Sequence, residues 1–540
     1  MADSRADAVA LETEGNALYF KSDFGAAHAK YSAAIKLDPK NAVLYSNRAA
    51  CAYGLNRYLD ATDDATKATE LDPTYAKAWG RRAAAALSLG RNTDAIHSWK
   101  HAIAVLPTDN PTPVQAKQRK QYQSDLAALE ARIARHKPNE LPVPEAMEVS
   151  GNSNLPWLLA NDMIPGLKRD QNWGSSVSAL NTPRQRQWIM CTEVCMSVST
   201  PCRISFMCSQ ILECFTDALV AEFRIVRMPM PTNIFEMFEK QVATQARNMN
   251  AWLQFGAQRV MKEVPRRLEK EGWSSVRPAL SITVRGWIFR GFMADCWESN
   301  ITAGLDVFTS ALEVLKWGAE KYKDVPLHER GAIFEPTYIR GVNTVTTHTI
   351  PLEEAIAGAN EIIEELKDVP IGTEGAAAAV ARGEPPGFWY AFYPYPKGLA
   401  YSLRGRVYDQ KAKKLKAEGN ESAAVDLFLR AAADYKQAAF MHPQDDGHRA
   451  WYLHCAFHNQ YNAGFPVRRL MRTLDMLNET LPLAQKIWCD PAHWPRMKPH
   501  FDLDMNIREN MKCGVDSGAV NPDLPVKMLL GDELDTMTLL

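Results

Sequence analysis

The sequence has almost no net charge and no long uncharged apolar run. Lys and Arg number 62 against 63 Asp and Glu, a formal charge of −1, so no global attraction to nucleic acid or anionic lipid is expected. The most apolar stretch, residues 204–223, contains Glu213 and Asp217, which are costly inside a membrane. The first residues lack the basic and apolar regions of a signal peptide. We therefore expect a cytoplasmic protein without a nucleic-acid or membrane partner.

Motifs of catalysis and cofactor binding are also missing. The sequence has no glycine-rich phosphate loop, nucleophile elbow or dinucleotide fingerprint. Five of the 10 cysteines lie close together without paired CxxC knuckles or a nearby histidine, which favours buried reduced thiols over zinc ligands. These are Cys191, Cys195, Cys202, Cys208 and Cys214. His454 and His458 are four residues apart, but no Glu follows the first as in HExxH, so we interpret them as core or groove histidines. We expect no catalytic residue, no bound metal and no cofactor.

What the sequence does contain is a repeat of 34 residues in its first quarter. Three columns keep this spacing: Pro39, Pro73, Pro107; Ala27, Ala61, Ala95; and Ala34, Ala68, Ala102. Small residues fit where two helices approach closely, and a proline ends each unit because it cannot continue the second helix. Each helix pair has an apolar face that only stacking covers, so the repeat predicts a helical solenoid with a concave inner surface.

The period and these columns resemble the tetratricopeptide repeat (TPR) over residues 8–110. The next stretch, 112–136, has apolar residues at helical spacing and resembles the capping helix that closes such arrays. A segment rich in Pro, Gly, Asn and Ser follows. We therefore predict an all-α protein with a TPR domain and capping helix at 1–136, a linker at 137–156 and a larger helical domain at 157–540.

One subset of this family, which the array resembles, holds the C-terminal Asp of an Hsp70 or Hsp90 tail in a clamp for two carboxylates. The resemblance places Asn16, Asn47, Lys77 and Arg81 at four of the five clamp positions. Lys77 and Arg81 are one helical turn apart, so both can donate charge-assisted hydrogen bonds to the same carboxylates. Asn16 and Asn47 would fix the peptide backbone with amide groups. The resemblance thus implies a peptide-binding groove.

The fifth clamp position departs from the family, because Glu12 stands where the pattern has a lysine. At about 4 Å and an effective dielectric near 20, its repulsion of a ligand carboxylate is about 4 kcal/mol. Micromolar binding corresponds to only about 8 kcal/mol. The clamp is therefore weakened, retuned to a different peptide, or rescued by a neighbour such as Arg82 or Lys21.

The region from residue 157 onward resembles no family and reads as mostly helical. Within residues 400–445, a degenerate repeat is indicated by Ala431, Tyr435, Ala438 and Pro443, which keep the spacing of Ala27, Tyr31, Ala34 and Pro39. The segment VNTVTTHTI at 342–350 is the best candidate for a strand or extended loop. The segment PPGFWYAFYPYP at 385–396 alternates proline and aromatics too densely for a helix interior, so we expect a packed loop.

Three functions remain open. The first is an adaptor or co-chaperone-like protein whose array docks a chaperone C-terminal tail or another acidic peptide, while the C-terminal domain binds a client or second protein. The second is a scaffold for a different partner, selected by Glu12. The third is an enzyme with its chemistry in the C-terminal domain, which a deep pocket gathering His454, His458 and carboxylates would support. We expect a binding protein rather than an enzyme.

Overall fold

The computed structural model describes residues 2–135, 211–221, 232–296, 300–349, 352–370, 372–488 and 494–525, together with Met163 and Arg169. Throughout these ranges the chain folds into helices, and the β contact recorded there is an isolated bridge between Pro466 and Pro525. The all-α prediction is confirmed. No helix of the described ranges is long and apolar enough to cross a membrane.

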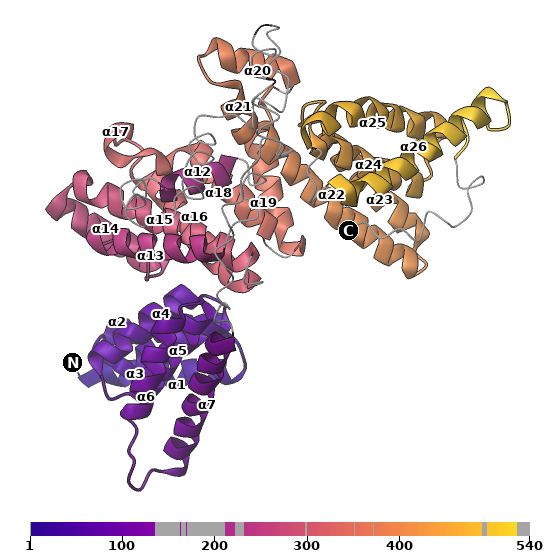
Figure 1. Cartoon of the computed structure of the whole chain (residues 1–540). Helices are drawn as coiled ribbons and strands as arrows, with labels where there is room; N and C mark the ends of the chain where they lie inside the picture. Colours follow the sequence, from indigo (N-terminus) through magenta and orange to yellow (C-terminus); the bar gives the residue numbers. More distant parts are fainter. Residues whose placement is uncertain are drawn as a thin grey trace. The chain divides into compact units, whose positions relative to one another are not determined.

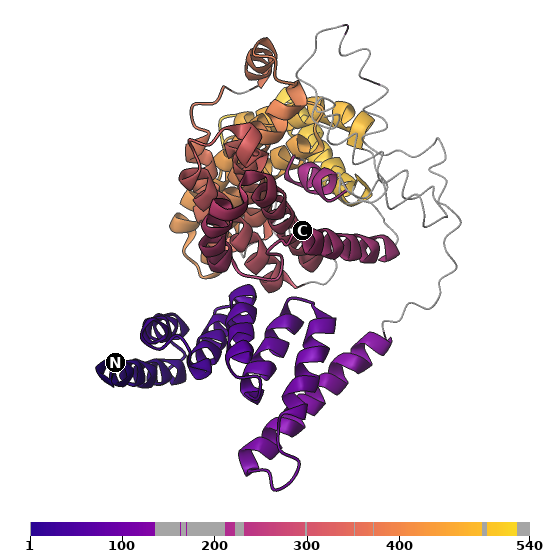
Figure 2. The same ribbon diagram turned by 90° about the vertical axis from the view of Figure 1, so that its left-hand side faces the viewer.

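The first seven helices form three helical hairpins followed by one long helix (Figures 1 and 2). They are α1 (Ala2–Phe20), α2 (Phe24–Leu37), α3 (Ala42–Gly54), α4 (Tyr58–Leu71), α5 (Ala76–Ser88), α6 (Asn92–Ala104) and α7 (Pro113–Arg135). Both alanine columns are buried. Gly15 lets α1 approach α2 closely, because a Cβ there would lie 2.9 Å from the Tyr31 ring. The predicted repeat is thus confirmed, and α7 occupies the expected capping segment with Leu129 packed on Ala83 and Ala86.

The contacts divide the chain into two compact units, which we call unit 1 (Met1–Ala146 with Pro231–Ile339) and unit 2 (Met147–Met230 with Arg340–Leu540). Unit 1 adds further helices to the array: α13 (Thr232–Asn248), α14 (Ala257–Glu271), α15 (Trp273–Cys296), α16 (Ile301–Lys321), α17 (Leu327–Arg330) and the short 3₁₀ helix η2 (Ala332–Phe334). Asp306 on α16 accepts a hydrogen bond from the Leu59 N–H at 2.9 Å and so caps the start of α4. No pattern in the sequence indicates that these helices pack on the array. The domain boundaries at 1–136, 137–156 and 157–540 stay predictions.

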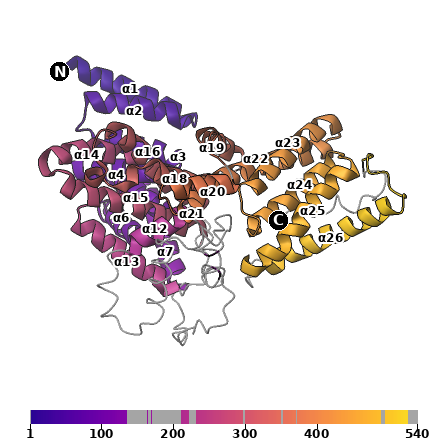
Figure 3. The ribbon, with the colours of Figure 1, turned by 90° about the horizontal axis from the view of Figure 1, so that it is seen from above.

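Unit 2 consists of short helices followed by a run of long ones. Its helices are α12 (Ile211–Ala221), α19 (Leu352–Glu365), α20 (Gly372–Ala381), α21 (Pro386–Phe392), α22 (Pro394–Ala417), α23 (Glu421–Phe440), α24 (Gly447–Asn462), α25 (Val467–Trp488) and α26 (Trp494–Asp516), with most of α18 (Pro336–Thr349). Figure 3 shows α22 to α26 side by side. The α22–α23 hairpin carries the predicted degenerate repeat: Ala431, Tyr435 and Ala438 are buried, and Gly405 faces the Tyr435 ring.

Two local predictions in unit 2 were wrong. Residues 342–349 are part of α18 rather than a strand; the remaining residue of that segment, 350, lies outside the described residues. The buried Thr346 and Thr347 each donate to the carbonyl four residues earlier, so tertiary packing overrides their β propensity. The segment 385–396 is not a loop, because Pro386 and Pro394 occupy first helical turns, where no N–H is required. Its aromatic residues Trp389 and Tyr390 are buried as expected.

Candidate functional site

Arg81 is one of the predicted peptide-binding residues, and hydrogen bonds tie it to a neighbouring helix. It lies on α5, and its Nη1 donates to the Ser46 Oγ at 2.7 Å and to the Asn47 Oδ1 at 3.1 Å, both on the neighbouring α3. These bonds hold the guanidinium against the adjacent helix, and its remaining N–H groups are not used in the recorded hydrogen bonds of the described residues. Lys77, one turn earlier on α5, is exposed, and no ion pair is recorded for it within the described ranges. The structure therefore brings Arg81 and Asn47 together and leaves Lys77 in solvent.

The side-chain carbonyl oxygens of both predicted asparagines accept a hydrogen bond from a residue of the array. The Tyr31 hydroxyl donates to the Asn16 Oδ1 at 2.7 Å, just as Arg81 donates to the Asn47 Oδ1. Since both carbonyl oxygens accept a hydrogen bond from the array itself, each side chain keeps its NH₂ group as a donor for a ligand. Neither asparagine is fully buried. The array thus fixes the orientation of both amide groups.

Glu12 lies close enough to Tyr31, the partner of Asn16, to affect its pKa. It lies partly buried one turn before Asn16, and burial raises the pKa of its carboxyl group. Burial, Cys51 and Glu12 raise the pKa of Tyr31 to about 12, whereas the Arg81 guanidinium opposes the shift. Neither proposed rescuer has a recorded contact with Glu12 in the described part of the chain: Arg82 lies over the Trp79 ring, 5.4 Å from its centroid.

Sequence reasoning missed three groups of this site. The Tyr31 hydroxyl positions Asn16, and the Ser46 hydroxyl positions Arg81. Tyr122 of α7 packs against α5 at Gly80. This close approach needs glycine, since a Cβ there would lie 2.6 Å from the Tyr122 ring. Burial raises the pKa of Tyr122, and Arg81 opposes this shift. Their roles depend on contacts between helices, which no spacing within one helix indicates.

The neighbouring Arg48 has a structural role instead. Its Nε and Nη2 donate to the two carboxylate oxygens of Asp64 on α4 at 2.7 and 2.6 Å, and Nη1 donates to Ser32 on α2. Asp64 is buried; the bidentate pair joins α3 to α4, and the bond to Ser32 adds α2. Of three consecutive residues, therefore, Ser46 and Asn47 contact Arg81, whereas Arg48 joins helices of the array.

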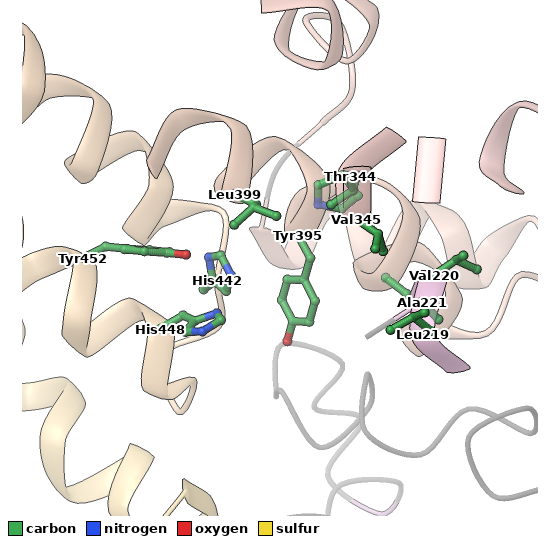
Figure 4. A pocket seen from close by; sticks show the side chains of 12 residues that line it. Leu219, Val220, Ala221, Thr344, Val345, Tyr395, Leu399, His442, His448 and Tyr452 are labelled. Atoms are coloured by element: carbon green, nitrogen blue, oxygen red, sulfur yellow. The ribbon is translucent and has the colours of Figure 1, made fainter. Parts of the chain in front are cut away.

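Unit 2 contains a small cavity of a different kind. Figure 4 shows His442, His448 and Tyr452 on one side of Tyr395, and Leu219, Val220 and Ala221 on the other. Its volume is about 30 Å³, which holds about one water molecule. His454 and His458 do not line it; they meet Asp504 in the buried core, with His454 Nδ1 2.6 Å from Asp504 Oδ2. This cavity is too small for an organic substrate and so does not support the enzyme hypothesis.

Three stacked helical hairpins in a 34-residue register, with buried alanine columns and a closing helix, define a tetratricopeptide repeat array, and the chain is a TPR protein. Comparisons with known proteins agree. The chain is 46% identical over 59 residues to the heat shock protein sti1 homolog of Schizosaccharomyces pombe, covering 11% of this chain and 10% of that protein. It is 45% identical over 53 residues to stress-induced-phosphoprotein 1 of Caenorhabditis elegans, covering 10% of this chain and 17% of that protein.

These similarities are local. The matched part spans about a tenth to a sixth of the relatives' length. Among solved structures, the first TPR of Spaghetti (RPAP3) bound to the HSP90 peptide SRMEEVD is 24% identical, with a TM-score of 0.21, and the match covers 24% of this chain and 94% of that one. No family model matches the chain.

Proposed function

We propose that the array binds an acidic peptide through its free C-terminal carboxylate, and that the protein is an adaptor of the co-chaperone type. The observation that carries this proposal is Arg81, held by Ser46 and Asn47 on the adjacent helix with N–H donors left over. A guanidinium that is fixed in advance loses little entropy when it binds a carboxylate. Lys77 adds a second cation one turn away.

The two amide NH₂ groups extend the site beyond the cations. Asn47 adjoins Arg81 directly, and Asn16 is fixed by Tyr31. Donors of this kind recognise peptide carbonyl and carboxylate oxygens without selecting a side chain. The site therefore favours a chain terminus, with one carboxylate at the main chain and a second on the last residue. A chaperone tail of the Hsp70 or Hsp90 type has this chemistry, and unit 2 is then the part that would bind a client or second protein.

Calorimetric titration of the full chain tests the proposal. The probes are the peptide SRMEEVD with a free C-terminus and the same peptide with a C-terminal amide. We expect the amide, and the variants Lys77→Ala and Arg81→Ala, to weaken binding by about 10- to 100-fold, since charge-assisted hydrogen bonds contribute about 1.5–3 kcal/mol. Lys40→Ala removes an exposed lysine elsewhere in the array and is the control. If both groove variants bind as tightly as the wild type, the groove does not bind the peptide.

Glu12 favours a second candidate, a scaffold whose ligand carries less negative charge. Glu12 lies partly buried one turn before Asn16, so its carboxylate, when ionised, repels a ligand carboxylate bound beside it. The variant Glu12→Lys separates the two candidates in the same titration. A modest gain over measurable wild-type binding supports the adaptor, whereas binding that appears only in Glu12→Lys supports the scaffold.

A further inference from the structure

Two pairs of side chains face each other across α24 and α26 in unit 2. His454 and His458 are one turn apart on α24, and His500 and Asp504 are one turn apart on α26. Asp504 joins them: its Oδ2 lies 2.6 Å from His454 Nδ1, and its Oδ1 lies 3.1 Å from His458 Nε2. The ring centroids of His454 and His500 are 5.5 Å apart. Three imidazoles and one carboxylate thus meet between two helices.

The charge of this cluster is not balanced by the protein. Asp504 has no exposed surface, and the only ion-pair partners recorded for it in the described ranges are the two imidazoles. A buried carboxylate is costly without a cation, and no lysine or arginine pairs with Asp504 among the described residues.

The hydrogen bonding of the cluster is also incomplete. His454 is 1% exposed, and its Nε2 is buried without a hydrogen-bond partner in the described part of the chain. Buried polar atoms are rarely left unpaired, so an orphaned ring nitrogen distinguishes this cluster from a fully satisfied polar core. Neutral imidazole and ionised carboxylate are also the forms in which these side chains bind metal ions.

We propose that His454, His458 and Asp504 bind a Zn²⁺ ion, with the fourth position left for a water molecule or, after a side-chain rotation, the neighbouring His500. One ligand atom from each of the first three residues lies within 4.8 Å of the others. Tetrahedral zinc with bonds of about 2.0–2.2 Å needs ligand atoms roughly 3.3 Å apart, so small rotations of the side chains are enough. Nitrogen and oxygen donors on facing helices suit Zn²⁺ better than Mg²⁺. Entry is possible at His458, whose side chain is 10% exposed, and at the half-buried His500.

The bound ion would staple α26 to α24. Because the ligands come from both helices, removing one of them leaves two and weakens binding without removing the packing of the helices. The role proposed is structural: no described cavity of substrate size lies at these residues, so we assign no reaction to the ion. From the sequence, His454 and His458 are interpreted as core or groove histidines because no Glu follows the first as in HExxH; Asp504, 50 residues from His454, is not part of any local motif.

Metal-free full-length protein is titrated with ZnSO₄ against a chromophoric chelator, and thermal unfolding is followed with Zn²⁺ or Mg²⁺. We expect one Zn²⁺ per chain, a higher Tm with Zn²⁺ only, and a loss of affinity of at least 10-fold in His458→Gln and Asp504→Asn. Asp504→Asn keeps the size of the side chain, and His328→Gln, an exposed histidine, is the matched control. Equal zinc binding by wild type and both variants overturns the proposal.

The cysteines need a separate control, because thiolates also bind zinc. Co²⁺ substitution of the wild-type protein provides it. A tetrahedral Co²⁺ spectrum without a thiolate charge-transfer band supports the site of nitrogen and oxygen ligands. A spectrum with that band places the ion on cysteine and overturns the proposal, even if the variants fail to fold.

Discussion

The TPR array and the α22–α23 hairpin of unit 2 share the same internal construction. In the array, Gly15 faces Tyr31, and Arg48 forms a bidentate pair with Asp64 on the next helix. In the hairpin, Gly405 faces Tyr435, and Arg404 forms a bidentate pair with Asp434 at 2.7 Å for both bonds. The exposed fractions of the four charged side chains match closely, 22% and 11% for Arg48 and Asp64 against 23% and 9% for Arg404 and Asp434. Both regions therefore pack their helices with a glycine–tyrosine contact and a bidentate arginine–aspartate pair.

The array and unit 2 differ in whether their other polar side chains are exposed or buried. The array keeps Lys77 exposed and holds the amide groups of Asn16 and Asn47 at its surface. Unit 2 turns its imidazoles inward, with His454 and Asp504 almost completely buried. The two regions thus share the packing of the helical hairpin and differ in where they place a few polar side chains.

The largest loss of stability is expected when Arg48 or Arg404, which pair with an aspartate on the next helix, is removed. Arg48→Ala and Arg404→Ala each leave a buried carboxylate without its partner, which costs about 3–5 kcal/mol for a fully buried pair. Since both arginines are about one-fifth exposed, we expect about 2–3 kcal/mol of local stability to be lost in each. Hydrogen exchange with mass spectrometry, read on peptides of α3–α4 and α22–α23, measures this without assuming that the whole chain unfolds at once.

Double-mutant cycles sharpen the same experiment. Replacing Asp64 together with Arg48, or Asp434 together with Arg404, removes the unpaired charge and should recover part of the loss. Similar coupling energies in the two cycles are expected from the matched geometry. A loss in one region and none in the other would show that the hairpin does not use the array's construction.

The sequence was sufficient to predict the helical pairs of both regions, but it did not indicate the side-chain contacts between helices. The proline and alanine columns predict the helical pairs because one residue type recurs wherever helices touch. Lys77 and Arg81 are assigned to the groove through the resemblance to the TPR family, and their spacing puts them on one face of one helix. Ser46, Tyr31 and Asp504 act across helices, and Asp306 caps α4 from 247 residues away, so no local pattern indicates them. The error at 342–349 has the same cause, because packing decided the conformation of β-branched residues.

An intermediate effect is expected where the array packs on α14 and α16. Burial raises the pKa of Asp63 to about 7 despite Arg259, and burial raises the pKa of Asp306 to about 7 despite the Leu59 N–H. The unfolded pKa is near 3.9, so the folded state binds more protons and unit 1 loses stability as pH rises through 7. Between pH 6 and pH 8 the expected loss is about 1.4 kcal/mol for each group.

Calorimetric melting of the full chain at both pH values measures this loss. Asp63→Asn and Asp306→Asn keep the shape of each side chain and remove its titration, so the difference between wild type and the double variant should shrink as pH falls toward 6. If the double variant depends on pH as strongly as the wild type, other groups control the effect.

The smallest expected effect comes from two helix caps that are equivalent in the two regions. Asn41 accepts a hydrogen bond from the Val43 N–H at 3.0 Å and caps α3, and Asn420 accepts one from the Ala423 N–H at 3.4 Å and caps α23. Replacing an N-cap asparagine by alanine costs about 1 kcal/mol, and glycine costs only a few tenths. We expect Asn41→Ala to cost slightly more than Asn420→Ala, because its hydrogen bond is shorter. Hydrogen exchange in the first turns of α3 and α23 reports each cap, with the glycine variants as controls. Exchange that rises equally in the alanine and glycine variants would mean that the side chain contributes packing instead of a cap.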